Sequence, residues 1–184
     1  MRLRRLLLGA MTAMALALPV SASQGVLASG AATMVLPCRS VALTPTVGHL
    51  GAASGTAYQA LLITNHASHA CTLSGTPSTQ FGNFVSSGGL VVFRAVGPAA
   101  KKLAFADRGK TVVVKRGAVA SVTVGIETAG NVPSSKCGHV VNASRVRLVF
   151  QNGAKLYYTL RTFAVCTKLA STLTSGVVLG TRFP

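Results

Sequence analysis

Few side chains in this 184-residue chain could carry catalysis, because it contains only two carboxylates, Asp107 and Glu127. General acid–base catalysis usually needs a positioned carboxylate, histidine or lysine, and glycoside hydrolysis commonly needs two carboxylates across the scissile bond. Asp107 lies in an Ala-Asp-Arg-Gly turn composition, where Asp normally hydrogen-bonds its own backbone, and Glu127 ends a predicted strand as a solvated charge. The sequence also contains no Gly-x-Ser-x-Gly elbow and no phosphate-binding loop. We therefore predict a protein that is not an enzyme and needs no cofactor.

The four histidines are the other groups that could transfer protons or bind a metal ion: His49, His66, His69 and His139. His66 and His69 flank a short connection and could share a metal ion, but two ligands make an incomplete site. Cys137 and His139 are spaced like a thiol beside its base, yet a cysteine in a disulfide cannot act as a nucleophile. The sequence therefore predicts an exposed polar turn at the first pair and no metal site.

Four cysteines follow an N-terminal export signal: Cys38, Cys71, Cys137 and Cys166. An even number of cysteines in an exported chain indicates a disulfide framework, and four cysteines allow three connectivities. Sequential pairing, Cys38 with Cys71 and Cys137 with Cys166, is favoured because each bond closes a short loop at one end of the domain. Zinc binding is the competing interpretation, but no Cys-x-x-Cys pair is present and the compartment is oxidising.

The first 22 residues have the pattern of a secretory signal peptide. Three arginines precede an apolar run at residues 6–20, and small residues at 21–23 favour cleavage after Ala22. The run is shorter than the ~20 residues that span a bilayer, so we expect no transmembrane segment in the mature chain. Residues 23–36 are rich in small side chains and predict a flexible leader, which leaves one domain at 37–184. We expect a secreted protein, extracellular or associated with the cell wall.

The charge is strongly basic, with 18 Lys and Arg residues against two carboxylates. Removal of the three arginines of the signal leaves a net charge of about +13, which attracts polyanions. Secretion argues against nucleic acid as the physiological target, and the sparse aromatic residues predict no stacking platform for bases.

Short β-branched or alternating runs, divided by Gly, Ser, Asn and Pro, fill the chain from residue 39 onward. The predicted strands are 40–46, 57–65, 69–74, 79–85, 90–96, 111–115, 118–127, 144–151, 155–163 and 176–182. This spacing predicts an all-β domain of two packed antiparallel sheets, an immunoglobulin-like sandwich with two disulfides behind a signal peptide. A closed barrel is the alternative.

One hairpin predicts a basic patch. Val146, Leu148 and Phe150 must share a buried face with Leu156, Tyr158 and Leu160, and a three-residue loop at 152–154 achieves this. That register places Arg145 opposite Arg161 and Arg147 opposite Thr159 on the outer face. Like charges across a ladder repel unless an anion or solvent offsets them. Arg145, Arg147 and Arg161 are therefore an anion-binding candidate, with a solvated basic face as the alternative.

The sequence also resembles a known family. Cys38, Gly55, Leu-Leu-Ile-Thr-Asn at 61–65 and Cys-Thr-Leu-Ser-Gly-Thr-Pro at 71–77 occur in the order found in the secreted actinobacterial family called domain of unknown function 4232. The second cysteine pair is similar too. The resemblance runs from Cys38 to the C-terminus and implies an exported or envelope-attached β-sandwich with disulfides and no assigned activity. Asn65 is expected to turn the strand end, and Gly75 and Pro77 to shape the next turn.

The leading functional hypothesis is a non-catalytic binding module, secreted or associated with the cell wall. Its basic surface would engage an anionic envelope polymer or an acidic protein. An envelope-modifying hydrolase with an unrecognised site is an alternative, as is an extracellular protein inhibitor or adhesion domain. An exposed apolar patch at one end of the sandwich would favour the last of these.

Overall fold

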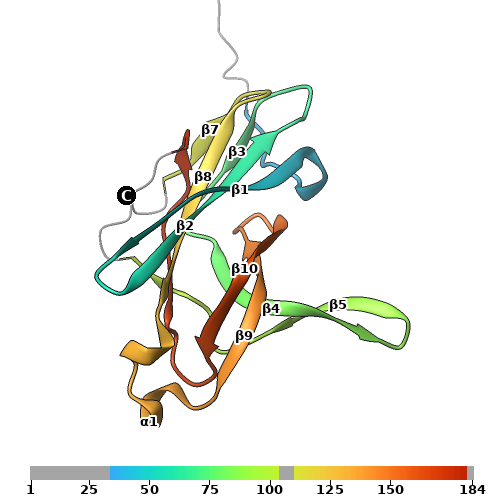
Figure 1. Cartoon of the computed structure of the whole chain (residues 1–184). Helices are drawn as coiled ribbons and strands as arrows, with labels where there is room; N and C mark the ends of the chain where they lie inside the picture. The colour runs from blue at the N-terminus through green and yellow to red at the C-terminus, as the bar shows by residue number, and fades with distance from the viewer. Residues whose placement is uncertain (1–33, 104–109, 182–184) are drawn as a thin grey trace, which may run out of the picture. The chain divides into compact units, whose positions relative to one another are not determined.

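Strands dominate the computed structural model, which describes residues 34–103 and 110–181 (Figure 1). In that part the strands are β1 (Leu43–Ala53), β2 (Thr56–Asn65), β3 (Cys71–Leu73), β4 (Ser78–Ser87), β5 (Leu90–Ala95), β6 (Lys101–Lys102), β7 (Val112–Val114), β8 (Val119–Glu127), β9 (Val140–Val149), β10 (Lys155–Cys166), β11 (Thr172–Thr174) and β12 (Val178–Leu179). Short helical turns are η1 (Ser40–Ala42), η2 (Ala129–Asn131) and α1 (Ser134–Cys137).

The strands form two main sheets and a small ladder. The larger sheet has the order β1-β2-β8-β11-β6, and β12 also pairs with β8. The second sheet has the order β10-β9-β4-β5, while β3 pairs with β7. Every pairing between these strands is antiparallel except that of β11 with β6. The prediction of an all-β domain with antiparallel sheets is confirmed.

The hydrophobic core contains side chains from both main sheets. The larger sheet contributes alternate residues of its central strands, among them Ile63 of β2 and Val122 of β8. The second sheet contributes Leu148 of β9 and Leu156 of β10 in the same way. A hydrogen bond also joins the sheets, from the Tyr158 hydroxyl of β10 to the Leu62 carbonyl oxygen of β2, at 3.2 Å. Period-two alternation in each strand is therefore what directs one face of each sheet into a shared core.

Both disulfides have the predicted sequential connectivity. Cys38 is bonded to Cys71, and Cys137 is bonded to Cys166. All four residues are buried. The first bond joins the segment before η1 to β3, and the second joins α1 to the end of β10.

The β9–β10 hairpin confirms the shared buried face but corrects the register. Leu148 pairs with Leu156 and Val146 with Tyr158, so each pair is shifted by two residues from the prediction. The loop has three residues, 151–153, and is closed by a hydrogen bond from the Phe150 N–H to the Ala154 carbonyl oxygen at 2.9 Å. Its last residue is Gly153, with φ of 82°. A glycine adopts this left-handed conformation without the steric cost that Ala154 would incur, which explains the earlier start of the loop.

Several short elements were not predicted. β6 contains two residues and β11 contains three. Both take strand conformation through pairing, because β11 pairs with β8 on one side and with β6 on the other. Such strands have too few residues to show a period. The predicted strand at 176–182 corresponds to β12 alone within the described residues.

The proposed signal peptide at 1–22 and most of the leader at 23–36 lie outside the described residues. Near the end of that leader, the Leu36 carbonyl oxygen accepts a hydrogen bond from the Thr72 N–H at 2.9 Å. Within 34–103 and 110–181, no helix has the length and apolar character needed to cross a membrane.

Tyr158 gives the fold a predicted sensitivity to high pH. Burial raises the pKa of Tyr158 far above its ordinary value of about 10. The unfolded chain loses this proton near pH 10 while the folded chain keeps it, so the free energy of unfolding falls as pH rises beyond that value.

We therefore expect Tyr158→Phe to behave differently at neutral and alkaline pH. At pH 7 the variant loses one hydrogen bond and about 1 kcal/mol of stability. Above pH 10 this deficit shrinks by up to about 1.4 kcal/mol per pH unit, because the variant has no hydroxyl to ionise. Urea unfolding at pH 7 and pH 11 measures the change. A stability deficit that stays constant with pH would contradict the raised pKa of Tyr158 in the folded chain.

Candidate functional site

The candidate site is the face of the four-stranded sheet that lies opposite the core. Val146 and Leu148 of β9 are in the core, so Arg145 and Arg147, which alternate with them, lie on the outer face. Strand pairing extends this face, since Tyr157 of β10 is the partner of Arg147 on one side. On the other side, Arg147 pairs with Gln80 and Arg145 with Gly82, both in β4.

Three aromatic rings gather on this face from three strands. Phe84 of β4 pairs with Phe93 of β5, and their ring centroids are 6.0 Å apart in an edge-to-face arrangement. The Tyr157 ring of β10 lies 5.5 Å from that of Phe84 and 5.7 Å from that of Phe93. Phe84 is 38% exposed and Tyr157 is 37% exposed. Such a cluster gains stabilisation from its quadrupoles while leaving ring surface open to a ligand.

The two arginines stack on these rings. The Arg145 guanidinium carbon lies 5.2 Å from the centroid of Phe84, and that of Arg147 lies 4.7 Å from the centroid of Phe93. Arg147 also donates a hydrogen bond through Nη2 to Oε1 of Gln80. Its Nε atom is buried and has no hydrogen-bond partner among the described residues. Stacking orients each guanidinium plane and restricts it to the sheet surface.

Gly82 is needed for this arrangement. A Cβ atom at this position would overlap the carbonyl oxygen of Arg94 and lie 2.8 Å from Cζ of Phe93. The absent side chain therefore lets β5 and the Phe93 ring approach β4 closely. We refer to Phe84, Phe93, Tyr157, Arg145 and Arg147 as the aromatic–arginine face.

Arg161 does not occupy its predicted position in this face. The predicted register placed it opposite Arg145, but Thr159 is the residue that pairs with Arg145. Arg161 is exposed and lies where the β9–β10 register shifts, between Thr159 and Phe163. The structure therefore brings Arg145 and Arg147 together on one strand without placing Arg161 across from either. The earlier start of the hairpin loop, at residue 151, is the cause.

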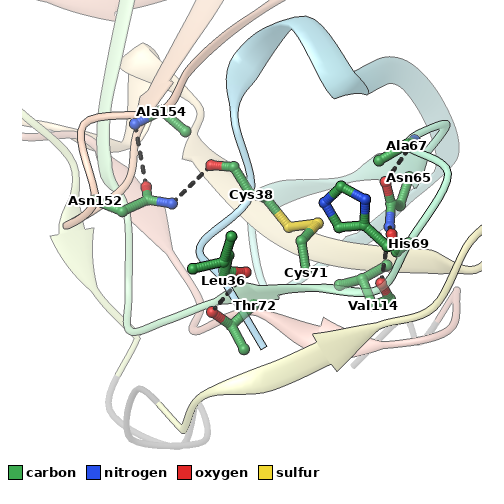
Figure 2. Close-up of a disulfide and its surroundings, with 10 residues drawn as sticks. All are labelled: Leu36, Cys38, Asn65, Ala67, His69, Cys71, Thr72, Val114, Asn152 and Ala154. Carbon is green, nitrogen blue, oxygen red and sulfur yellow. Dashed lines mark hydrogen bonds between the residues drawn. A yellow bond between two sulfur atoms is a disulfide. The ribbon is translucent and has the colours of Figure 1, made fainter. Parts of the chain in front are cut away.

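A pocket of about 580 Å³ lies beside the first disulfide, and Figure 2 shows that disulfide and the residues around it. Arg39, Val41, His69 and Asn152 are among its lining residues. Asn152 fastens this region to the β9–β10 loop, because its Nδ2 donates to the Cys38 carbonyl oxygen at 2.8 Å. This hydrogen bond holds two segments of the chain together, and both cysteines at the pocket are in a disulfide and have no thiol.

Comparison with known proteins places the domain in a family. Residues 38–176 match the family model described as domain of unknown function (DUF4232). The chain belongs to the DUF4232 family. The matched region includes both disulfides and the aromatic–arginine face. No curated protein and no solved structure matches the chain, so the finer comparison with immunoglobulin domains stays a prediction.

Asn65 has a structural position in this DUF4232 domain. It is fully buried, and its Nδ2 donates to the carbonyl oxygens of His69 at 3.0 Å and Val114 at 2.9 Å (Figure 2). Its Oδ1 accepts from the Ala67 N–H at 2.9 Å. The side chain thus joins the end of β2 to the following turn and to β7, which agrees with its predicted role at the strand end.

The other candidate residues of the DUF4232 domain are dispersed. His66, His69 and His139 are exposed, and no group of three metal-ligating side chains occurs within the described ranges. Glu127 is half-buried at the end of β8, and Asp107 lies outside the described residues. Cys137, beside His139, is in a disulfide and has no thiol.

The sparse aromatic composition of the sequence gave no indication that three of the rings gather on one face of a sheet. Sequence reasoning also missed Gln80, which pairs with Arg147. One signal was available: in β4, Phe84 shares the polar alternation of Gln80 rather than that of Phe81.

Proposed function

We propose that this protein is a secreted or cell-wall-associated, non-catalytic binding module that engages an anionic envelope polymer through the aromatic–arginine face. The observation that carries the proposal is the stacking of Arg145 and Arg147 on Phe84 and Phe93. Two oriented guanidinium groups on an exposed sheet face offer N–H donors to carboxylate or phosphate oxygens.

The geometry favours a polymer with repeated charges. Arg145 and Arg147 alternate along β9, so their Cα atoms are separated by about 7 Å. Successive anionic groups of a flexible chain can reach two donors at such a spacing. The large excess of basic residues over the two carboxylates of the sequence adds long-range attraction for a polyanion.

The chemistry of the face supports a binding role rather than catalysis. Arginine stays protonated at neutral pH, and the Gln80 amide and the phenylalanine rings do not transfer protons. The two arginines, the Gln80 amide and the phenylalanine rings can orient and neutralise an anion, but none of them is a general base.

We expect the double variant Arg145→Ala/Arg147→Ala to bind an anionic polymer at least about tenfold more weakly than the native chain. Retention on immobilised polygalacturonate and on cell-wall material, eluted with increasing salt, measures the change. Native retention should itself decrease with salt, because screening weakens charge contacts at an exposed face.

Lys115→Ala/Arg116→Ala is the matched control, because it removes the same charge from exposed positions in the turn between β7 and β8, outside the four-stranded sheet. This control should keep most of the native retention. Equal losses in the two double variants would show that net charge alone, and not the aromatic–arginine face, governs binding.

A further inference from the structure

The β4–β5 hairpin extends beyond the strands that support its base. Pairing of β4 with β9 ends at Gly82 and Arg145, whereas pairing of β4 with β5 continues to Ser87 and Leu90. Figure 1 shows this part of the hairpin projecting away from β9. Leu90 is 69% exposed and Val91 is 70% exposed. The hairpin therefore exposes apolar side chains to solvent, and these side chains are not part of the hydrophobic core.

The outer edge of β5 is open to strand addition. β5 is the last strand of its sheet, and no strand in the described part of the chain pairs with its second edge. Edge strands are usually protected by Lys, Pro, a bulge or a covering segment. β5 reads Leu-Val-Val-Phe-Arg-Ala, without Lys or Pro, and its pairing with β4 is regular from end to end. Its backbone groups are thus available for an added strand.

Arginines lie on both faces of the sheet near this edge. On the outer face, Arg147 of β9 stacks on the ring of Phe93, which leans toward Gly82 of β4. Arg94 follows Phe93 in β5 and therefore lies on the opposite face. In an added strand, one side chain would lie beside Arg94. The next would lie on the outer face, the face of Phe93 and Arg147, and the following two would lie beside Val92 and Val91.

A groove beside Arg94 can receive one of those side chains. It has a volume of about 400 Å³, and its lining includes Asn83, Val85, Arg94 and Val141. Its polar and apolar walls suit a carboxylate-bearing side chain with an aliphatic stem. The groove therefore provides a contact surface on the face of the β4–β5 hairpin that carries Arg94.

We propose that the outer edge of β5 receives an extended acidic segment of another protein as an additional β-strand. The segment would carry two adjacent acidic residues, one beside Arg94 and one on the face of Arg147, followed by apolar residues beside Val91 and Val92. Charge complementarity selects this occupant, since a second copy of the chain would bring the same arginines and the same net positive charge to the edge. This inference goes beyond the polymer-binding proposal, because it depends on a backbone edge that a polysaccharide does not pair with.

The test uses a short peptide with two adjacent glutamates flanked by alternating valine and threonine. Its control is the same peptide with alternate backbone amides N-methylated, which keeps the charges but prevents strand pairing. We expect the unmodified peptide to bind the full mature chain at least about tenfold more tightly than the methylated one. Amide exchange at Val91 and Phe93 should slow in the complex. Equal affinity for the two peptides would overturn the proposal.

Two variants test the charges. Arg94→Glu should weaken peptide binding at least about tenfold, while Arg161→Glu, an equal change in charge at an exposed position, should leave it nearly unchanged. Val91→Glu, at a highly exposed site, should also repel the peptide without loss of folding. Both edge variants should keep salt-dependent polygalacturonate retention, which separates this proposal from the function of the aromatic–arginine face. Sedimentation that showed the native chain dimerising through β5 would overturn the proposal in favour of a second copy.

Discussion

The variant Cys38→Ala/Cys71→Ala is expected to lose about 3–4 kcal/mol in the free energy of unfolding relative to the native chain. The bond closes a loop with a sequence separation of 33 residues, so its removal enlarges the conformational freedom of the unfolded chain. Cys137→Ala/Cys166→Ala, with a separation of 29 residues, is expected to lose nearly as much. Together these losses are comparable to the total stability of about 5–15 kcal/mol that is typical of a domain.

Urea unfolding with and without reductant measures these losses. Reduction should shift the native chain to lower urea and each double variant by a smaller amount, because one bond remains in it. A variant that lacks all four cysteines is the control, since reductant has no bond to break there. Transitions of the native chain that coincide with and without complete reduction would contradict a stabilising role for the disulfides.

Asn65→Asp is expected to destabilise the domain by about 3–5 kcal/mol at neutral pH. The substitution removes two N–H donors and leaves the carbonyl oxygens of His69 and Val114 facing a buried negative charge. One bond, from the Ala67 N–H, would remain. A buried carboxylate with repulsive partners is more costly than a missing side chain, so Asn65→Ala is expected to lose less, about 2–3 kcal/mol.

The pH dependence of Asn65→Asp stability distinguishes an effect of the buried negative charge from an effect of the altered side-chain shape. Burial and the two carbonyl oxygens raise the pKa of the introduced carboxyl above its unfolded value of about 3.9. A raised folded pKa means that stability is regained as pH falls toward that unfolded value. Chemical denaturation at pH 7 and pH 4 should therefore show a smaller deficit at pH 4, with Asn65→Ala as the reference. A deficit that is equal at both pH values would rule out the charge mechanism.

The two proposed binding modes use different properties of the same sheet. Polymer binding depends on guanidinium groups that are held flat by aromatic rings, and it should weaken with salt. Strand addition at β5 depends on backbone hydrogen bonds and should be lost when the ligand backbone is methylated. Arg147 contributes to both, while Arg94 and Val91 belong only to the edge.

Much of the fold could be predicted from local patterns. Alternation placed Leu148 and Leu156 on one buried face, and the structure confirms this. The register was harder, because Asn152, Gly153 and Ala154 all lie near the turn and a shift of two residues preserves the buried face. The left-handed position of Gly153 decided it. β6 and β11 could not be predicted, since only pairing with a distant strand gives them their conformation.

The sequence by itself determined the all-β class, because alternation is a property of neighbouring residues. It favoured one of three possible pairings of the four cysteines, and the structure confirms that pairing. The tertiary structure alone decided which outward side chains meet. Phe93 and Arg147 are far apart in the chain, and they stack only because β4 lies between β5 and β9 and Gly82 permits close approach. Strand order and register are set by the whole sheet, so no local pattern specifies that contact.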